Sequence, residues 1–184
     1  MERGEGIFCF LKERRGQIWI ETVIYTLIAL TLIGAVLAFI TPRIGEIQDK
    51  AIVEQSIGLM ENLNNVILSV VQGGAGNKRI IDLSLKKGTL NIDSVSDEIV
   101  FEMESEYEYS QIGEVVEIGS LTAKTEESGS LNKITLISNQ NKYDLTYNGD
   151  DTEKEISKST TPYKLSIENK GESGGKIVVD INLV

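Results

Sequence analysis

A long run of apolar residues near the start of the chain constrains the fold more than any other feature. From Thr22 to Ile40 the sequence carries 19 residues without a single charge. As a helix this run is ~29 Å long, which is close to the thickness of the hydrocarbon core of a bilayer. The run exceeds the ~7–15 apolar residues of a secretory signal peptide, and no small-residue cleavage site follows it. The sequence therefore predicts a transmembrane helix that stays on the protein.

One carboxylate, Glu21, stands directly before the uncharged run, and the basic residues Lys12, Arg14 and Arg15 lie upstream. Basic residues beside a membrane helix favour the cytoplasmic side, so we expect the N-terminus in the cytoplasm and the bulk of the chain outside. A carboxylate inside a bilayer costs on the order of 2–3 kcal/mol. Glu21 therefore either reaches the headgroup layer or pairs with a cation that something else supplies.

The basic cluster is followed by Gly16, then Gln17, then Glu21, and then the apolar run. This order resembles the processing site of archaeal type IV pilin precursors, which carry a class III signal peptide. The resemblance covers roughly residues 12–45. It implies that a prepilin peptidase cuts after Gly16, so that Gln17 becomes the first residue of the mature chain and Glu21 the fifth. It also implies that Glu21 attracts the new N-terminal amine of a neighbouring subunit during filament assembly.

The pattern beyond the membrane run predicts one long helix over residues 17–72, with its hydrophobic part at 18–40. Pro42 and Gly45 predict a kink or a short unwound patch, because proline removes a helical hydrogen bond and clashes with the preceding turn. After them, apolar residues recur at helical spacing. That stripe could face a coiled-coil partner, but packing on a β-sheet of the same chain is the preferred interpretation. The glycines of residues 73–77 predict a helix C-cap and a flexible joint.

The remainder, residues 78–184, alternates apolar and polar residues with the period of β-strands. Asn139-Gln140 predicts a tight hairpin, and the Gly/Ser/Asp/Thr-rich stretches 121–130 and 148–161 are expected to be loops. The pattern favours an antiparallel sheet or a β-sandwich and hence an α+β fold. The expected strands cover residues 79–85, 89–93, 97–109, 114–120, 132–138, 141–147, 163–169 and 176–184.

The stretch 97–109 is the most unusual of these strands. Its apolar and aromatic residues alternate with five glutamates, Glu98, Glu102, Glu104, Glu106 and Glu108. The glutamates could form a cation-binding ridge. We favour a solvated strand face, whose charges keep a sheet edge from aggregating.

Composition excludes several classes of function. The chain has no histidine and one cysteine, Cys9, so it lacks the commonest general base and any Cys/His zinc site. Its 28 acidic residues against 18 basic residues give a net charge of −10, which argues against a nucleic-acid surface. No catalytic motif is present, and we expect a protein without enzymatic activity, cofactor or metal.

The resemblance to type IV pilin precursors, taken with these features, implies a structural subunit of an archaeal pilus-like filament that serves adhesion or surface attachment. Residues 1–16 would be a cleaved cytoplasmic leader, and residues 78–184 an extracellular β-rich domain. The expected partners are other copies of the chain, the prepilin peptidase, the pilus assembly machinery and, before assembly, the membrane. The alternative is an uncleaved signal-anchored or minor pilin-like envelope protein whose β-domain binds a ligand.

Overall fold

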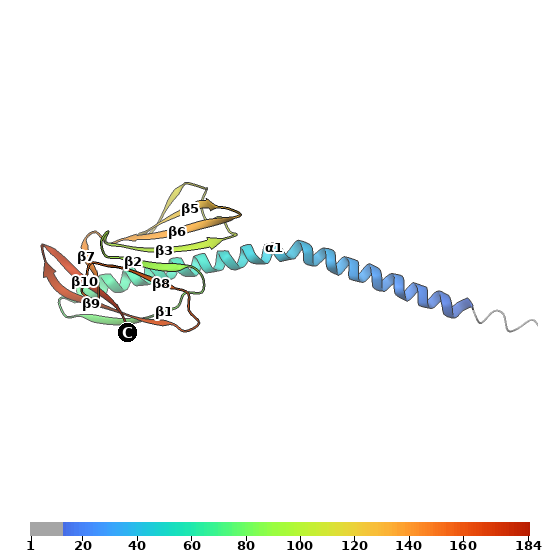
Figure 1. Ribbon diagram of the computed structural model, residues 1–184, viewed down its shortest axis with the longest axis horizontal. Helices are drawn as coiled ribbons and strands as arrows, with labels where there is room; N and C mark the ends of the chain where they lie inside the picture. Colours follow the sequence, from blue (N-terminus) through green and yellow to red (C-terminus); the bar gives the residue numbers. More distant parts are fainter. Residues whose placement is uncertain (1–12) are drawn as a thin grey trace, which may run out of the picture. The chain divides into compact units, whose positions relative to one another are not determined.

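The computed structural model describes the chain from Glu13 to Val184, with side chains from Trp19 onward except that of Pro42. In this part of the chain a single helix, α1 (Glu13–Gln72), precedes ten β-strands (Figure 1). The predicted α+β class is therefore confirmed. The chain divides into two compact units between Ile44 and Gly45. We call the second unit, Gly45–Val184, the head.

Helix α1 continues without interruption through Pro42 and Gly45. The predicted unwound patch is therefore wrong. Proline deletes one hydrogen bond of the ladder, and the remaining bonds of a 60-residue helix are sufficient to keep the backbone helical across that gap. A bend of the helix axis at these two residues stays a prediction.

The part of α1 that belongs to the head buries one stripe of side chains. These residues recur at intervals of three and four along the helix, so they lie on one face. Their side chains are completely or almost completely buried: Val53, Met60, Leu63, Ile67 and Val70. They belong to the same core cluster as residues of the β-strands. The stripe thus packs on this chain's own sheets, as preferred, and not on a coiled-coil partner.

The helix ends where the glycine-rich joint was predicted, and Gly74 and Gly76 both adopt positive φ angles of 81° and 83°. The joint is held in place by strand β9, because Gly76 N–H donates to the carbonyl oxygen of Asn169 at 2.7 Å. In return Asn169 N–H donates to the carbonyl of Asn77 at 2.9 Å. These bonds constrain the segment that was expected to be a flexible joint.

Ten strands form two sheets. Four strands in the order β1-β9-β10-β7 make one sheet, and six in the order β4-β5-β6-β3-β2-β8 make the other. All pairs are antiparallel except β10 with β7, which is parallel. The strand bounds are β1 (Lys78–Leu83), β2 (Thr89–Asp93), β3 (Glu98–Ser105), β4 (Val115–Ile118), β5 (Leu121–Ser128), β6 (Leu131–Asn139), β7 (Tyr143–Tyr147), β8 (Glu153–Ser157), β9 (Tyr163–Ser173) and β10 (Lys176–Leu183).

Both sheets contribute to one hydrophobic core together with α1. Phe101 and Leu136 come from the six-stranded sheet, and Ile167 and Ile181 from the four-stranded sheet; all four are fully buried. In β10, Val179 and Ile181 are buried, and Ile177 and Leu183 pack partly against the same core.

Two strands occupy regions that were expected to be loops. Strand β5 lies within 121–130 and β8 within 148–161. Each is rich in charged and hydroxyl residues, so its apolar alternation is short. The buried positions of β5 include Thr125, and β8 buries only Ile156.

The predicted hairpin at Asn139-Gln140 is also wrong. Strands β6 and β7 belong to different sheets, and the chain crosses between the sheets at this turn. Gln140 N–H donates to the carbonyl of Asp97 at 2.8 Å, which ties the crossing to the start of β3 and not to a hairpin partner.

Candidate assembly helix and polar sites of the head

The first candidate site is the apolar segment of α1, residues 19–41. Every side chain described in it is exposed, and Trp19 and Phe39 each expose 74 % of their surface. Its most apolar 18-residue window has a mean hydropathy of 2.6, and none of that window is buried within the chain. Soluble monomers rarely expose a continuous apolar surface of this extent. The helix is long and apolar enough to cross a membrane, and its surface needs lipid or protein to cover it.

The polar groups inside the apolar segment are mostly satisfied by the helix itself. The hydroxyl of Thr31 donates to the carbonyl of Leu27 at 2.7 Å, and that of Thr41 to Leu37 at 2.7 Å. Thr26 makes the same bond to the carbonyl of Thr22. Such back-bonding hides a hydroxyl from an apolar environment. Glu21 is the one charged residue in this segment, and it cannot donate to a helix carbonyl as the threonine hydroxyls do, because a carboxylate only accepts hydrogen bonds.

Glu21 is exposed, and no hydrogen bond or ion pair joins it to another side chain that the structure describes. Gly16 and Gln17 lie in the same helix, within its first turns. Gln17 and Glu21 are four residues apart and so lie on one helix face, one turn from each other. The backbone of Arg14 and Arg15 is helical too, whereas residues 1–12, which include Lys12, lie outside the described residues.

A second polar site joins α1 to the β-strands inside the head. Asp49 exposes only 6 % of its surface. Its Oδ1 accepts from Lys87 Nζ at 2.6 Å, and its Oδ2 accepts from the backbone N–H of Glu106 at 2.7 Å. On the next residue of the helix, Lys50 Nζ lies 5.7 Å from the centre of the Tyr107 ring. This junction of α1 with the end of β3 was not visible in the sequence, where Asp49 resembles any solvated helix charge.

Gly45 has a role beyond the predicted kink. A Cβ added to it would stand 2.2 Å from the carboxylate oxygen Oε2 of Glu106. The carboxylate of Glu106 thus lies directly against the helix backbone at Gly45, and because Glu106 is a flexible, exposed side chain it can turn away from a larger residue there. Glycine is the residue that permits such close approach.

The glutamate-rich stretch 97–109 behaves largely as a solvated strand face. Ile99, Phe101 and Met103 are buried. Of the glutamates, Glu102 forms an ion pair with Lys133, whose Nζ lies 2.8 Å from Glu102 Oε1. Among the residues that the structure describes, no group of three acidic, histidine or cysteine side chains is arranged to hold a metal ion. The glutamates of β3 occupy partly or fully exposed positions, as expected of a solvated strand face. The predicted protection of a sheet edge is wrong, because β3 lies between β6 and β2 in the interior of the six-stranded sheet.

Beyond β3 the same stretch turns back onto the core. Tyr107 and Tyr109 pack partly against it. Burial raises the pKa of Tyr109 above its ordinary value, and the nearby Tyr107 and Glu54 raise it further. The stretch leaves the sheet at Ser105, because the Ser105 hydroxyl bonds both the N–H and the carbonyl of Tyr107 at 2.9 Å.

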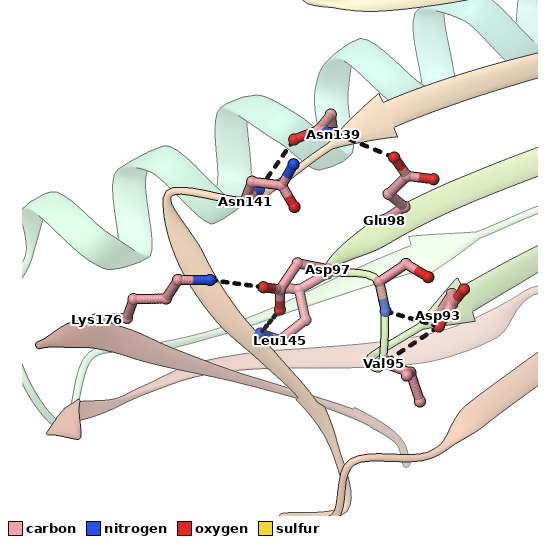
Figure 2. Close-up of polar contacts among 9 residues, drawn as sticks. Asp93, Val95, Asp97, Glu98, Asn139, Asn141, Leu145 and Lys176 are labelled. Atoms are coloured by element: carbon pink, nitrogen blue, oxygen red, sulfur yellow. Dashed lines mark hydrogen bonds and ion pairs between the residues drawn. The ribbon is translucent and has the colours of Figure 1, made fainter. Parts of the chain in front are cut away.

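A turn at the start of β3 concentrates further polar contacts (Figure 2). Asp97 has a positive φ of 54°, and its carboxylate accepts from Leu145 N–H at 2.9 Å and from Lys176 Nζ at 2.8 Å. Asp93 caps the same turn by accepting from the N–H groups of Val95 and Ser96. Burial alone would raise the pKa of Asp93, but the hydrogen bonds from Ser96 and Val95 outweigh it and lower that pKa. These contacts are made within the chain and fix the turn, so we assign them a structural role.

Comparison of the chain with models of protein families, with characterised proteins and with solved structures finds no match in any of the three.

Proposed function

We propose that the chain is a structural subunit of a type IV pilus-like surface filament of the archaeal kind, assembled through its N-terminal helix after leader cleavage. The observation that carries the proposal is the apolar segment, whose described side chains are all exposed and which holds a single charge, Glu21. A compact head with its own core follows on the same helix. Before assembly, such a subunit would be anchored in the membrane by its apolar segment. In the filament it would bury that segment against other copies of the chain. It would need no catalytic residue and no cofactor.

The proposal gives Glu21 a partner. A lone carboxylate in an apolar environment costs on the order of 2–3 kcal/mol. A cation held at about 4 Å in an environment of effective dielectric ~20 returns about 4 kcal/mol. The α-amine released by cleavage before Gln17 has a pKa near 8 and is largely cationic at neutral pH. Pairing therefore offsets the burial of Glu21, and an unpaired carboxylate penalises a wrong axial register.

The same helix also offers Glu21 a competing partner. In its own chain the released amine of Gln17 would lie four residues away, about 6 Å along the axis. At that distance the Coulomb attraction is weaker by about one third than at 4 Å. A neighbouring subunit thus has to bring its amine closer than one helical turn for assembly to be favoured.

The first test determines the N-terminus of the protein made in its native host. The proposal expects a mature chain that begins at Gln17 and is recovered in surface filaments. Recovery of the intact precursor from membranes, with no assembled material, would overturn it.

The second test compares Glu21→Ala with Glu54→Ala, which removes an exposed glutamate of the same helix inside the head. Both variants should fold and be processed. We expect Glu21→Ala to reduce the yield of sheared filaments at least tenfold, which corresponds to ~1.4 kcal/mol per assembly step. Glu54→Ala should assemble normally. Equal filament yields from the two variants would show that Glu21 has no role in assembly.

The alternative is an uncleaved signal-anchored or minor pilin-like envelope protein whose head binds a ligand. One observation favours it. Helix α1 begins at Glu13 and runs unbroken through Gly16 and Gln17. A peptide bond inside a helix must open locally before a peptidase can cut it. The N-terminal determination separates this alternative from the filament subunit.

A further inference from the structure

A hollow of about 240 Å³ lies on the head beside α1. Side-chain amides and hydroxyls dominate its lining, which also holds one lysine and one aromatic ring and contains no carboxylate. In a chain with 28 acidic residues such a lining is unusual.

The floor of the hollow is a fixed hydrogen-bond network. Asn64 Oδ1 accepts from Ser138 Oγ at 2.5 Å and from Gln140 Nε2 at 2.7 Å. Asn64 Nδ2 donates to Ser120 Oγ at 2.9 Å, and Gln140 Nε2 also donates to Ser138 Oγ at 2.7 Å. These bonds join α1 to strand β6 and to the turns at residues 120 and 140. They set the direction in which each amide presents its remaining donor or acceptor before any ligand arrives.

One acceptor in this network is left over. Gln140 exposes only 7 % of its surface, and the two hydrogen bonds that its side chain makes to Asn64 and Ser138 both use the nitrogen Nε2. Its oxygen Oε1 makes no hydrogen bond to any residue that the structure describes. An amide oxygen can accept two hydrogen bonds. Among the described residues the buried side-chain oxygens without a partner are those of Ser94 and Ser166, so Gln140 Oε1 is reached by solvent. A side chain that is more than nine-tenths buried and lines a hollow, with a free and accessible acceptor, suits a ligand that donates hydrogen bonds.

The rest of the lining narrows the chemistry of that ligand. The ring of Tyr143 is partly buried, and beside it Leu68 exposes 45 % of its surface. The exposed residues Asn65 and Ser120 each offer both a donor and an acceptor. A ligand that suits these groups carries several hydroxyls around an apolar face. Lys142 is the single cation of the lining, which is too little charge for a phosphate-rich ligand.

We propose that this hollow binds one ring of a saccharide, with hydroxyls donating to Gln140 Oε1 and the C–H face of the ring packing on Tyr143. Its volume is below the ~300–1,000 Å³ of sites for drug-sized molecules, so it admits a single ring unit of a longer glycan. A small, polar, shallow site of this type binds weakly and gains strength when many copies act together. The inference concerns a single head and does not depend on filament assembly.

The test uses the full chain in micelles of a zwitterionic detergent, because detergents with sugar headgroups would compete. The probes are the methyl glycosides of glucose, galactose, mannose, N-acetylglucosamine and glucuronic acid, examined one at a time by saturation-transfer difference NMR. The wild-type chain should transfer saturation to the C–H protons of at least one probe. Tyr143→Leu should reduce that signal at least fivefold, since it removes the ring but keeps apolar volume.

Tyr163→Leu is the matched control, because Tyr163 also packs partly on the core but does not line the hollow. A second variant, Asn65→Leu, changes an exposed helix residue that lines the hollow and leaves the core intact. It should weaken binding without lowering the midpoint of thermal unfolding. Saturation transfer to none of the five probes, or signals equal in Asn65→Leu and Tyr163→Leu, would overturn the proposal.

Discussion

The junction between α1 and the end of β3 gives the sharpest energetic prediction. Replacing Asp49 by alanine removes the acceptor of two hydrogen bonds, one from the charged Lys87 and one from the N–H of Glu106. A hydrogen bond to a charged group contributes about 1.5–3 kcal/mol, and a buried N–H left unpaired costs about 1–3 kcal/mol. The Lys87 side chain is 36 % exposed, so its amine can turn to water and its share lies at the lower end. Asp49→Ala should therefore lower the free energy of unfolding of the head by about 3 kcal/mol.

Urea unfolding of the detergent-solubilised chain measures this loss. The single tryptophan, Trp19, lies outside the head, and every tyrosine except Tyr25 lies within it. Near-ultraviolet circular dichroism of tyrosine thus reports on the head, and tryptophan fluorescence on the apolar segment. With a denaturant slope near ~2 kcal/mol per molar, the midpoint for the head should fall by about 1.5 M.

A double-mutant cycle isolates the ion pair. Asp49→Asn keeps an acceptor for Glu106 N–H but loses the negative charge, and Lys87→Met removes the cation. The coupling energy between the two changes should be at least about 1 kcal/mol. The reasoning would be refuted by a coupling energy near zero together with a decrease of less than about 1 kcal/mol in the free energy of unfolding for Asp49→Ala. Hydrogen bonds to water would then stabilise these groups as well as the junction does.

Two further predictions concern glycine and pH. Gly74→Ala should destabilise the head by about 1 kcal/mol, because residue 74 has a φ of 81°. Gly58→Ala should stabilise the head by about 0.5–1 kcal/mol, because residue 58 lies in the helix interior with open space around it. Thermal unfolding of the two variants should therefore give shifts of opposite sign. The hydrogen bond to Asp97 raises the pKa of Lys176 in the folded protein above its ordinary value. The Lys176–Asp97 pair therefore stabilises the fold fully below the pKa of the unfolded state, near 10.5, and this stabilisation is lost as the pH rises through the higher pKa of the folded state. The difference in stability between wild type and Lys176→Met should therefore be constant from pH 7 to 9 and shrink above about pH 11, and a difference that grows with pH would contradict this sign.

The parts of the fold that the sequence predicted are those with a strong apolar period. The helix stripe at Val53, Met60 and Ile67 and the alternation at Ile99 and Phe101 each place large side chains on one face, and burial follows directly from that spacing. The helix end near residue 72 was predictable because consecutive glycines are poor helix formers and suit positive φ.

The missed parts are those where polar residues take core positions. In β5 the buried Thr125 keeps its place because its hydroxyl bonds Ser110 at 3.0 Å, a contact 15 residues away that no local pattern contains. Asp180 is buried in β10 because Thr146, Gly149 and Asn182 all donate to its carboxylate. Its sequence context between Val179 and Ile181 predicts an outward charge.

The polar hollow was missed for a related reason. Asn64 is one of several amides on the polar side of α1, and Gln140 occupies a turn signal. Nothing in the sequence indicates that residues 76 positions apart meet at 2.7 Å. Only the crossing of the chain between the sheets at residue 140 brings them together.

That crossing is one of four, because the chain enters the two sheets in an interleaved order. β1 belongs to the four-stranded sheet, β2 to β6 to the six-stranded sheet, β7 to the first again, β8 to the second, and β9 and β10 to the first. Neither sheet is encoded by a continuous stretch of chain. The β-rich part of the head therefore cannot be divided into exchangeable halves. A chimera in which half of residues 78–184 comes from another protein would disrupt both sheets at once. Sequence can be inserted with least damage at the exposed turns, such as Gly129 between β5 and β6, which join neighbouring strands of a single sheet.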